Sequence, residues 1–304
     1  MNYRHQFHAG NFADVMKHAL LVQLVRGMQR KEKGFLYLDT HAGRGCYDLA
    51  AEARGDSLAR RPEWPEGIGR LWGAEPADEG VAAYVALVRR FDAEKGGPVS
   101  RGAARKNGAV PEAGGLPRFY PGSPWIVRMM AREQDRLALC EKHPEEHAAL
   151  ARAFRRSPGS SVHEMDGYVA LRAMLPPPER RALVLIDAPF EAQEEFAQIA
   201  AALAEGLGRL PGAVVAIWYP LTERARVDAF FAELARLRLP PTLGLELAIA
   251  GDGSAIRMRG CGLVVVNPPW QFEEAARPML QALAGKLAQE PGGGVRAEWL
   301  VPER

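Results

Sequence analysis

The chain has 304 residues, of which 47% are hydrophobic and 25% charged, and its formal net charge is +2. This length suffices for one large α/β domain with an insertion or for two modest domains, and so small a charge does not by itself indicate a nucleic-acid partner. Basic residues gather near positions 101–106, 152–156 and 180–181, where ordinary solvated surface explains them as well as RNA contact does.

Cys46, Cys140 and Cys261 are far apart and form no C-x-x-C pair, so the sequence indicates neither a disulfide framework nor a cysteine zinc site. Cys140 and Cys261 lie in apolar runs that are typical of buried strands. The charged, histidine-containing N-terminus is unlike a signal peptide, and no apolar run is long enough to span a bilayer. We therefore expect a cytoplasmic protein.

A helix is predicted over residues 11–30. Asn11 is of a type that caps helix N-termini, and Asp14 three residues later comes close to completing a capping box. Apolar residues then recur at helical spacing, which indicates that one face meets a core. Residues 35–39 follow as a short apolar strand that ends on Asp39, before a glycine-containing turn.

The pattern changes over residues 49–118. Two helices are predicted, at 66–74 and 78–95, and a Gly/Pro/Ala-rich stretch with basic residues follows. A long loop of this kind fits a peripheral insertion better than the interior of a sheet. The expected boundaries are 1–48 and 119–304 for the main domain and 49–118 for a small helical insertion.

Strands and helices alternate from residue 119 onward. The first of these helices has Ser123 as its expected cap and Pro124 at its first position. Further strands are predicted at 136–141, 161–166, 182–187, 213–220, 243–250 and 260–267, with a possible edge strand at 295–301. Such alternation predicts an α/β fold with a mostly parallel, doubly wound sheet of seven strands.

Four predicted strands end on an acidic residue: Asp39, Glu141, Asp166 and Asp187. Ligands of doubly wound sheets bind outside the carboxyl ends of the strands. We therefore expect these four side chains to face a single crevice.

The turn "DTHAGRG" places Gly43 and Gly45 directly after the first strand. Glycines there let the backbone approach a ligand closely, with amides free to bind an anion. The full G-x-G-x-x-G fingerprint is absent, which disfavours nicotinamide or flavin binding. Glu141, at the end of the next strand, offers a carboxylate that can accept from both hydroxyls of a ribose.

Two stretches compete as the reactive motif. "DAPF" at 187–190 is nearly the D-P-P-F of enzymes that methylate amino groups on bases, and "NPPW" at 267–270 matches a variant of it fully. We favour Asp187, because its strand lies at the crevice whereas Asn267 is expected near the sheet edge. Ala188 keeps the backbone carbonyl and precedes Pro189, so it is still held extended. We therefore expect activity to survive the missing proline.

The strings "YRHQFHAGNFADVMKH", "LYLDTHAGRG", "YPGSP", "CEKHP", "DGY", "LIDAPFE", "WYP" and "NPPW" occur in the order typical of one family. The chain resembles the bacterial methyltransferases that modify an adenine N6 of 23S ribosomal RNA, from about Tyr3 to Pro302. The resemblance implies a Rossmann-like fold, S-adenosylmethionine as cofactor, S-adenosylhomocysteine as product, and no metal. It also implies 23S rRNA as partner, free or in an assembly intermediate, with no membrane and no obligate protein partner.

The resemblance also assigns site residues. Those implied to line the cofactor site, beside Asp39, Gly43, Gly45 and Asp187, are Lys17, His18, His41, Ser123, Glu141, Asp166 and Gly167. Glu141 is expected to hold the ribose and Asp166 the adenine amine of the cofactor. Tyr3 and His5 are expected over the reacting groups near Lys17, and Asp187 is the expected catalytic acid residue.

The expected chemistry suits the "DAPF" motif. An exocyclic adenine amine is a poor nucleophile, because its lone pair is delocalised into the ring. The Asp187 carboxylate and the carbonyl of residue 188 can accept its two hydrogens, while Phe190 stacks on the base. Positioning and electrostatics then supply most of the rate gain. A paired base would first have to be flipped out.

Several alternatives remain open. "HPEEH" at 143–147 matches a zinc-protease signature, but Pro144 puts His143 at the helix start and no third ligand is evident. Lys17 could be an ordinary surface lysine. The protein could bind S-adenosylmethionine and RNA without catalysis, or it could methylate adenine in DNA.

Overall fold

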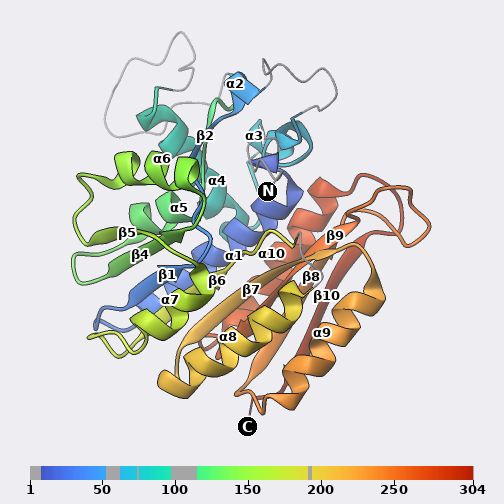
Figure 1. Cartoon of the computed structure of the whole chain (residues 1–304). Helices are drawn as coiled ribbons and strands as arrows, with labels where there is room; N and C mark the ends of the chain where they lie inside the picture. The colour runs from blue at the N-terminus through green and yellow to red at the C-terminus, as the bar shows by residue number, and fades with distance from the viewer. Residues whose placement is uncertain (1–7, 53–61, 74, 97–114, 191–193, 304) are drawn as a thin grey trace.

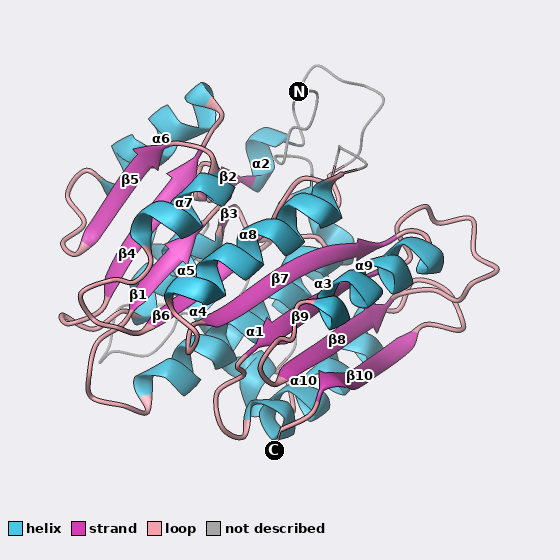
Figure 2. Cartoon of the chain, turned by 60° about the horizontal axis from the view of Figure 1, so that its bottom comes forward, coloured by secondary structure: helices cyan, strands magenta, loops and turns pink. Residues whose placement is uncertain are grey.

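The computed structural model describes residues 8–52, 62–73, 75–96, 115–190 and 194–303. Tyr3, His5 and the basic residues near position 100 lie outside this part of the chain. In the described part, one large twisted sheet lies between two layers of helices (Figures 1 and 2). None of the described helices is long and apolar enough to cross a membrane.

The main sheet has eight strands in the order β10-β8-β9-β7-β6-β1-β4-β5. Their bounds are β1 (Leu36–Asp39), β4 (Arg136–Glu141), β5 (Ser160–Glu164), β6 (Ala182–Ile186), β7 (Val214–Leu221), β8 (Thr242–Ala248), β9 (Gly260–Val266) and β10 (Gly294–Val301). The strands from β5 to β7 are parallel, whereas β9 runs antiparallel to β7 and β8. The α/β class and the mostly parallel sheet are confirmed.

The predicted number of seven strands is one too few. β10 pairs antiparallel with β8 over the length of that strand and becomes the edge of the sheet. Its residues alternate between exposed and partly buried, which is weaker patterning than that of the fully buried β6. The possible edge strand of the sequence is thus a full member of the sheet.

The chain leaves β1 toward β4 and β5 on one side, and returns to β6 and β7 on the other. This reversal opens a crevice at the carboxyl end of β1, between β4 and β6. α1 (Phe12–Gln29), α4 (Glu79–Glu94), α5 (Ser123–Met130), α6 (Pro144–Phe154) and α10 (Phe272–Leu287) cover one face. The other face carries α7 (Gly167–Met174), α8 (Glu195–Arg209) and α9 (Arg224–Arg236), seen in front in Figure 2.

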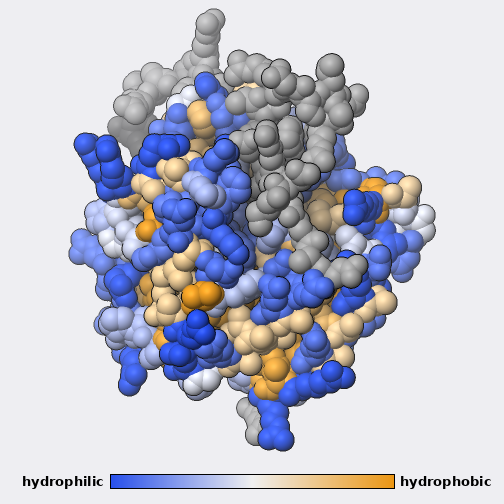
Figure 3. Space-filling view, in the orientation of Figure 1, coloured by the Kyte–Doolittle hydropathy of each residue, from blue (hydrophilic) through white to orange (hydrophobic). Residues whose placement is uncertain are grey.

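Strand side chains alternate between these two layers. In β6, Leu183 and Leu185 join the core under α1, while Val184 and Ile186 join the core under α8. Figure 3 shows hydrophilic residues over most of the visible face, with apolar residues gathered in the region of α8 and α9. Because both faces are covered, every residue of β6 is buried, as a continuous apolar run predicts.

Helix α1 begins as predicted but is buried on more than one face. The Asn11 side chain caps it by accepting hydrogen bonds from the backbone N–H groups of Ala13 and Asp14. α4, α5 and α10 pack around α1, so even Lys17 has only 4% of its surface exposed. The alternative of an ordinary surface lysine is therefore wrong.

Residues 49–118 leave the main sheet and return to it through a small two-stranded sheet. β2 (Cys46–Asp48) pairs antiparallel with β3 (Phe119–Pro121) at the two ends of this segment. The helices described between them are α2 (Leu49–Glu52), the 3-10 helix η2 (Trp64–Glu66), α3 (Gly69–Trp72) and α4. α4 buries Tyr84 and Val88 against the α1 side of the molecule. Treating this segment as a separate insertion stays a prediction.

Candidate functional site

A cavity of about 1800 Å³ opens at the carboxyl ends of the parallel strands. Glu141, Asp166 and Asp187 all line it. Asp39 does not join them on the wall: it is completely buried and contacts the wall residue Ser123. Three of the four predicted acids thus face the cavity, and the fourth lies behind it. Since single-ligand pockets span about 300–1,000 Å³, the cavity has room for two ligands.

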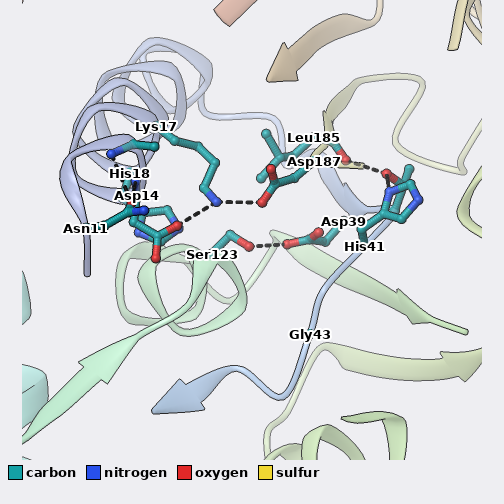
Figure 4. A network of polar contacts seen from close by, with 12 residues as sticks. Asn11, Asp14, Lys17, His18, Asp39, His41, Gly43, Ser123, Leu185 and Asp187 are labelled. Carbon is teal, nitrogen blue, oxygen red and sulfur yellow. Dashed lines mark hydrogen bonds and ion pairs between the residues drawn. The ribbon is translucent and has the colours of Figure 1, made fainter. Parts of the chain in front are cut away.

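Lys17 joins two carboxylates at the centre of the site (Figure 4). Its Nζ lies 2.5 Å from Oδ2 of Asp187 and 2.8 Å from Oδ1 of Asp14. Burial alone lowers the pKa of Lys17, but the two carboxylates outweigh burial and raise it above its ordinary value. Lys17 therefore remains protonated near neutral pH and cannot act as a general base there.

Asp39 is held by two hydroxyl donors beneath the wall. The Tyr37 hydroxyl and the Ser123 hydroxyl each donate to Oδ2 at 2.7 Å, while the buried Oδ1 has no hydrogen-bond partner among the described residues. Burial raises the pKa of Asp39 to about 6, against the opposing effect of the two hydroxyls. The prediction that Ser123 caps the helix is wrong. Ser123 is the first residue of α5, and Gly122 is the cap.

Backbone N–H groups of the turns after β1 and after β4 bind the Glu141 carboxylate. The backbone N–H of Gly43 donates to Oε2 of Glu141 at 2.8 Å, and that of His143 donates to Oε1 at 2.7 Å. Gly43 and Gly45 have φ of +58° and +77°, a region that L side chains rarely adopt. A Cβ on Gly43 would also lie 2.6 Å from the Tyr47 hydroxyl. The two glycines are therefore required by the geometry of the turn.

Asp166 and Gly167 begin helix α7 at another part of the wall. Asp166 caps the helix by accepting from the backbone N–H of Tyr168, and it also accepts from Nζ of Lys142 at 2.9 Å. Burial opposes ionisation of Asp166, but these donors outweigh it and lower its pKa. A Cβ on Gly167 would lie 2.1 Å from the backbone oxygen of Thr40, so only glycine lets α7 approach β1 this closely.

Two histidines of the wall are held in different ways. His41 shares a hydrogen bond with the Thr40 hydroxyl at 2.8 Å, and burial lowers its pKa to about 4. His18 is buried, and its Nδ1 lies 2.8 Å from the Tyr120 hydroxyl, which in turn lies 2.8 Å from the Tyr84 hydroxyl. The cavity is thereby connected to helix α4 through a chain of polar contacts.

The "DAPF" motif lies in the cavity wall. Asp187 directly follows β6 and lines the cavity with Ala188, Pro189 and Phe190. Ala188 is 2% exposed, and Phe190 has φ of +52°. The Phe190 ring centroid lies 5.7 Å from that of Trp218 in an edge-to-face arrangement. These contacts set the direction of the Phe190 ring beside the carboxylate.

The "NPPW" motif lies at the opposite end of the sheet. Asn267 follows the antiparallel strand β9, whose Val266 pairs with Val215 at the start of β7. The Asn267 side chain donates to the backbone oxygens of Pro211 and Ala213, and Trp270 is 72% exposed. The prediction that Asn267 lies near the sheet edge is wrong, because β9 is inserted between β7 and β8. The motif is nevertheless remote from the cavity.

Three residues at the cavity wall or in contact with it are not predicted from the sequence: Asp14, Tyr120 and Trp218. Asp14 is more than a capping residue, since it accepts from both Lys17 and the backbone N–H of Gly10. Its spacing of three residues from Lys17 is the signal that could have revealed the pair. Tyr120 and Trp218 belong to the family strings "YPGSP" and "WYP", but local spacing does not reveal their partners, which come from distant parts of the chain.

The histidines of "HPEEH" do not converge on a common point. His143 precedes α6 and lines the cavity, whereas His147 lies 3.6 Å from Glu164 of β5. Among the described residues there is no group of three or more metal-ligating side chains.

A doubly wound sheet with a ligand-sized cavity at the carboxyl ends of its parallel strands places the protein in the class of Rossmann-like α/β proteins. The chain belongs to the family described as ribosomal RNA large subunit methyltransferase D, RlmJ, whose model matches residues 32–106 and 111–301.

Full-length relatives and one solved structure agree with this family. The proteins named ribosomal RNA large subunit methyltransferase J from Escherichia coli and Haemophilus influenzae are each 35% identical over 303 residues, covering 100% of this chain and of the relative. The crystal structure of protein LPL1258 from Legionella pneumophila is similar with a TM-score of 0.79 and 30% identity, over 96% of this chain and 98% of that one.

Proposed function

We propose that the protein transfers a methyl group from S-adenosylmethionine to the N6 amine of a specific adenine in 23S rRNA. The observation that carries this proposal is the hydrogen bonding of the two Asp187 carboxylate oxygens. Its Oδ2 accepts from Lys17, while no described residue forms a hydrogen bond with Oδ1. One oxygen of a cavity-lining carboxylate is thus available to a substrate N–H group.

The residues of the wall fit S-adenosylmethionine. The Glu141 oxygens each accept one backbone N–H and keep further acceptor capacity, which suits the two hydroxyls of a ribose. Asp166 is an ionised acceptor that suits an adenine amine, and Gly167 next to it lets the start of α7 approach Thr40 closely. When bound, the cofactor supplies an electrophilic methyl group on a positively charged sulfur.

The catalytic task of the chain is to orient the amine. The free oxygen of Asp187 and the carbonyl of Ala188 are proposed to accept the two N6 hydrogens, which favours a pyramidal nitrogen with its lone pair directed at the methyl group. Phe190 is proposed to stack on the base. Lys17 positions the Asp187 carboxylate through their ion pair. The negative charge of this carboxylate then offsets the positive charge that develops on the amine nitrogen. Tyr3 and His5 are proposed to cover the reacting groups, although they lie outside the described residues.

The substrate class is supported by the relatives, which are named for methylation of ribosomal RNA of the large subunit. The size of the cavity is compatible with a base extruded next to the cofactor. An unpaired adenine costs less to extract than a paired one, so protein-free 23S rRNA or an assembly intermediate is the proposed partner.

The deciding experiment offers labelled S-adenosylmethionine with protein-free 23S rRNA, assembled subunits or duplex DNA. We expect label in the protein-free rRNA, recovered as N6-methyladenosine after digestion, and a loss of about 10²–10³-fold for Asp187→Ala. Transfer to DNA alone would overturn the rRNA substrate. Cofactor binding without transfer to any of the three would leave a binding protein rather than an enzyme.

A further inference from the structure

A second, smaller hollow adjoins the main cavity beside the proposed position of the target base. It has a volume of about 220 Å³, and its wall includes Phe190, Phe196 and Pro220. Phe190 and Pro220 also line the main cavity, as do Thr222 and Arg257 of the hollow. The two spaces therefore lie side by side, separated by residues that include the ring that is proposed to stack on the adenine.

The hollow is formed by two loops at one end of the sheet. Thr222 and Arg226 lie where β7 passes into α9, and Arg257 lies in the loop between β8 and β9. Leu221 at the end of β7 and Ala248 at the end of β8 both pair with Gly260, which brings the two loops together. In Figure 1 the β8–β9 loop projects beyond the sheet at this end.

The arginines of these loops fall into two kinds. Arg224 is paired with Asp228 and Glu246, and Arg259 lies 3.6 Å from Asp252. Arg226 and Arg257 are exposed, and their guanidinium groups have no ion pair or hydrogen bond with any described residue. In each loop, one arginine is thus paired with an acidic residue, and the other lies at the hollow without such a partner among the described residues.

The charge of the hollow is positive on balance. Glu223 also lines it and is exposed, but it forms no ion pair with either arginine within the described ranges. Thr222 adds a hydroxyl donor. Two guanidinium groups and a hydroxyl suit a phosphodiester, which guanidinium binds with two parallel hydrogen bonds.

We propose that Arg226 and Arg257 bind a backbone phosphate of the single-stranded RNA segment next to the target adenine. This inference rests on the proposed function. A base that enters the main cavity past Phe190 carries its own sugar and phosphate at the mouth of that cavity. The hollow lies at this side of Phe190, so a phosphate held there sets the depth at which the base meets Asp187.

The test compares the double variant Arg226→Gln/Arg257→Gln with a control that changes charge equally, Arg26→Gln/Arg236→Gln. The control residues are exposed and without ion pairs to described residues, and they lie near the C-terminal ends of α1 and α9, away from the cavity. For the first variant we expect the RNA KM to rise at least about tenfold, and the salt slope of RNA binding to fall by about 0.7, the value for one neutralised phosphate of a single strand. Its cofactor affinity should match that of the unmodified protein.

The inference is overturned if both double variants change RNA KM and the salt slope equally, since that would indicate general charge. It is also overturned if the first variant leaves RNA KM unchanged. If the unmodified protein methylates no RNA at all, the proposed function fails, and this inference fails with it. A fall in cofactor affinity for the first variant alone would assign the arginines to the cofactor instead of the RNA.

Discussion

Lys17 Nζ lies 2.5 Å from Oδ2 of Asp187, although the two residues are 170 positions apart in the chain. Their side chains are only 5% and 15% exposed. A charge so far removed from water needs a counter-ion, and Lys17 and Asp187 supply one for each other. The pair links the buried helix α1 to the reactive end of β6.

Replacement of Lys17 by Met should therefore lower both the stability of the fold and the rate of methyl transfer. We expect the free energy of unfolding to fall by about 3 kcal/mol, because the Asp187 carboxylate loses its buried partner. We also expect kcat for methyl transfer to fall about 100-fold. Urea unfolding and single-turnover transfer measure the two effects. Lys17→Arg, which keeps the charge, should retain more of both, and an unchanged kcat in Lys17→Met would contradict the proposed role.

Lys17 also makes a pH prediction. Its pKa is raised above the ordinary value of 10.5, so its contribution to stability is fully present below pH 10.5 and is lost only as the pH rises further. The rate of transfer should consequently show no alkaline inflection due to Lys17 up to about pH 10. An inflection there that disappears in Lys17→Arg would show that Lys17 titrates in the reaction.

Asp14 is expected to act through Lys17. Asp14→Asn keeps an acceptor for the backbone N–H of Gly10 but removes the charge that faces the ammonium. We expect the free energy of unfolding to fall by about 3 kcal/mol and kcat to fall without a matching rise in RNA KM. Asp78→Asn is the matched control, because Asp78 caps α4 through Val81 N–H and Asn caps equally well. A normal kcat in Asp14→Asn would leave Asp14 a purely structural residue.

The missing proline should affect stability more than function. Ala188→Pro is expected to raise the free energy of unfolding by about 0.4–1 kcal/mol, because proline restricts the unfolded chain. Since Ala188 already supplies the backbone carbonyl, kcat should change little. If the natural protein binds the cofactor but transfers no methyl group, and Ala188→Pro restores transfer, the expectation that activity survives is wrong.

His41 should stay neutral throughout the physiological range. Burial lowers its pKa from 6.5 to about 4. A lowered pKa means that its contribution to stability is present above pH 6.5 and is lost as the pH falls toward about 4. NMR of histidine-labelled protein measures this titration directly, and His41→Gln assigns the signal. A titration midpoint near 6.5 would show that the ring is solvated.

The approach of α7 to β1 should tolerate only glycine at residue 167. Gly167→Ala would place a Cβ 2.1 Å from the Thr40 backbone oxygen, so Asp166 and the start of α7 must shift. We expect cofactor affinity to fall at least about tenfold, equivalent to about 1.4 kcal/mol. Gly208→Ala on α8 meets nothing within 4 Å and should stabilise the protein by about 0.5–1 kcal/mol. Calorimetric titration with the cofactor distinguishes the two.

Local sequence patterns are sufficient to predict the elements and the chemistry of their ends. Apolar runs that stop on an acid predicted β1, β4 and β6, because buried parallel strands need continuous apolar residues and their polar ends face the crevice. The capping chemistry of Asn11 and the glycines of the turn after β1 were also local signals. The family strings identify the family to which the chain belongs.

Which of these residues meet depends on packing between elements that are distant in the chain. The insertion of β9 between β7 and β8 depends on pairing between distant segments, so "NPPW" could not be located by strand order alone. The burial of Lys17 depends on α4, α5 and α10 closing around α1, and a residue's own neighbours in sequence do not record that enclosure. Spacing along the chain reports local geometry, whereas the partner of a buried charge is set by packing between elements far apart in sequence.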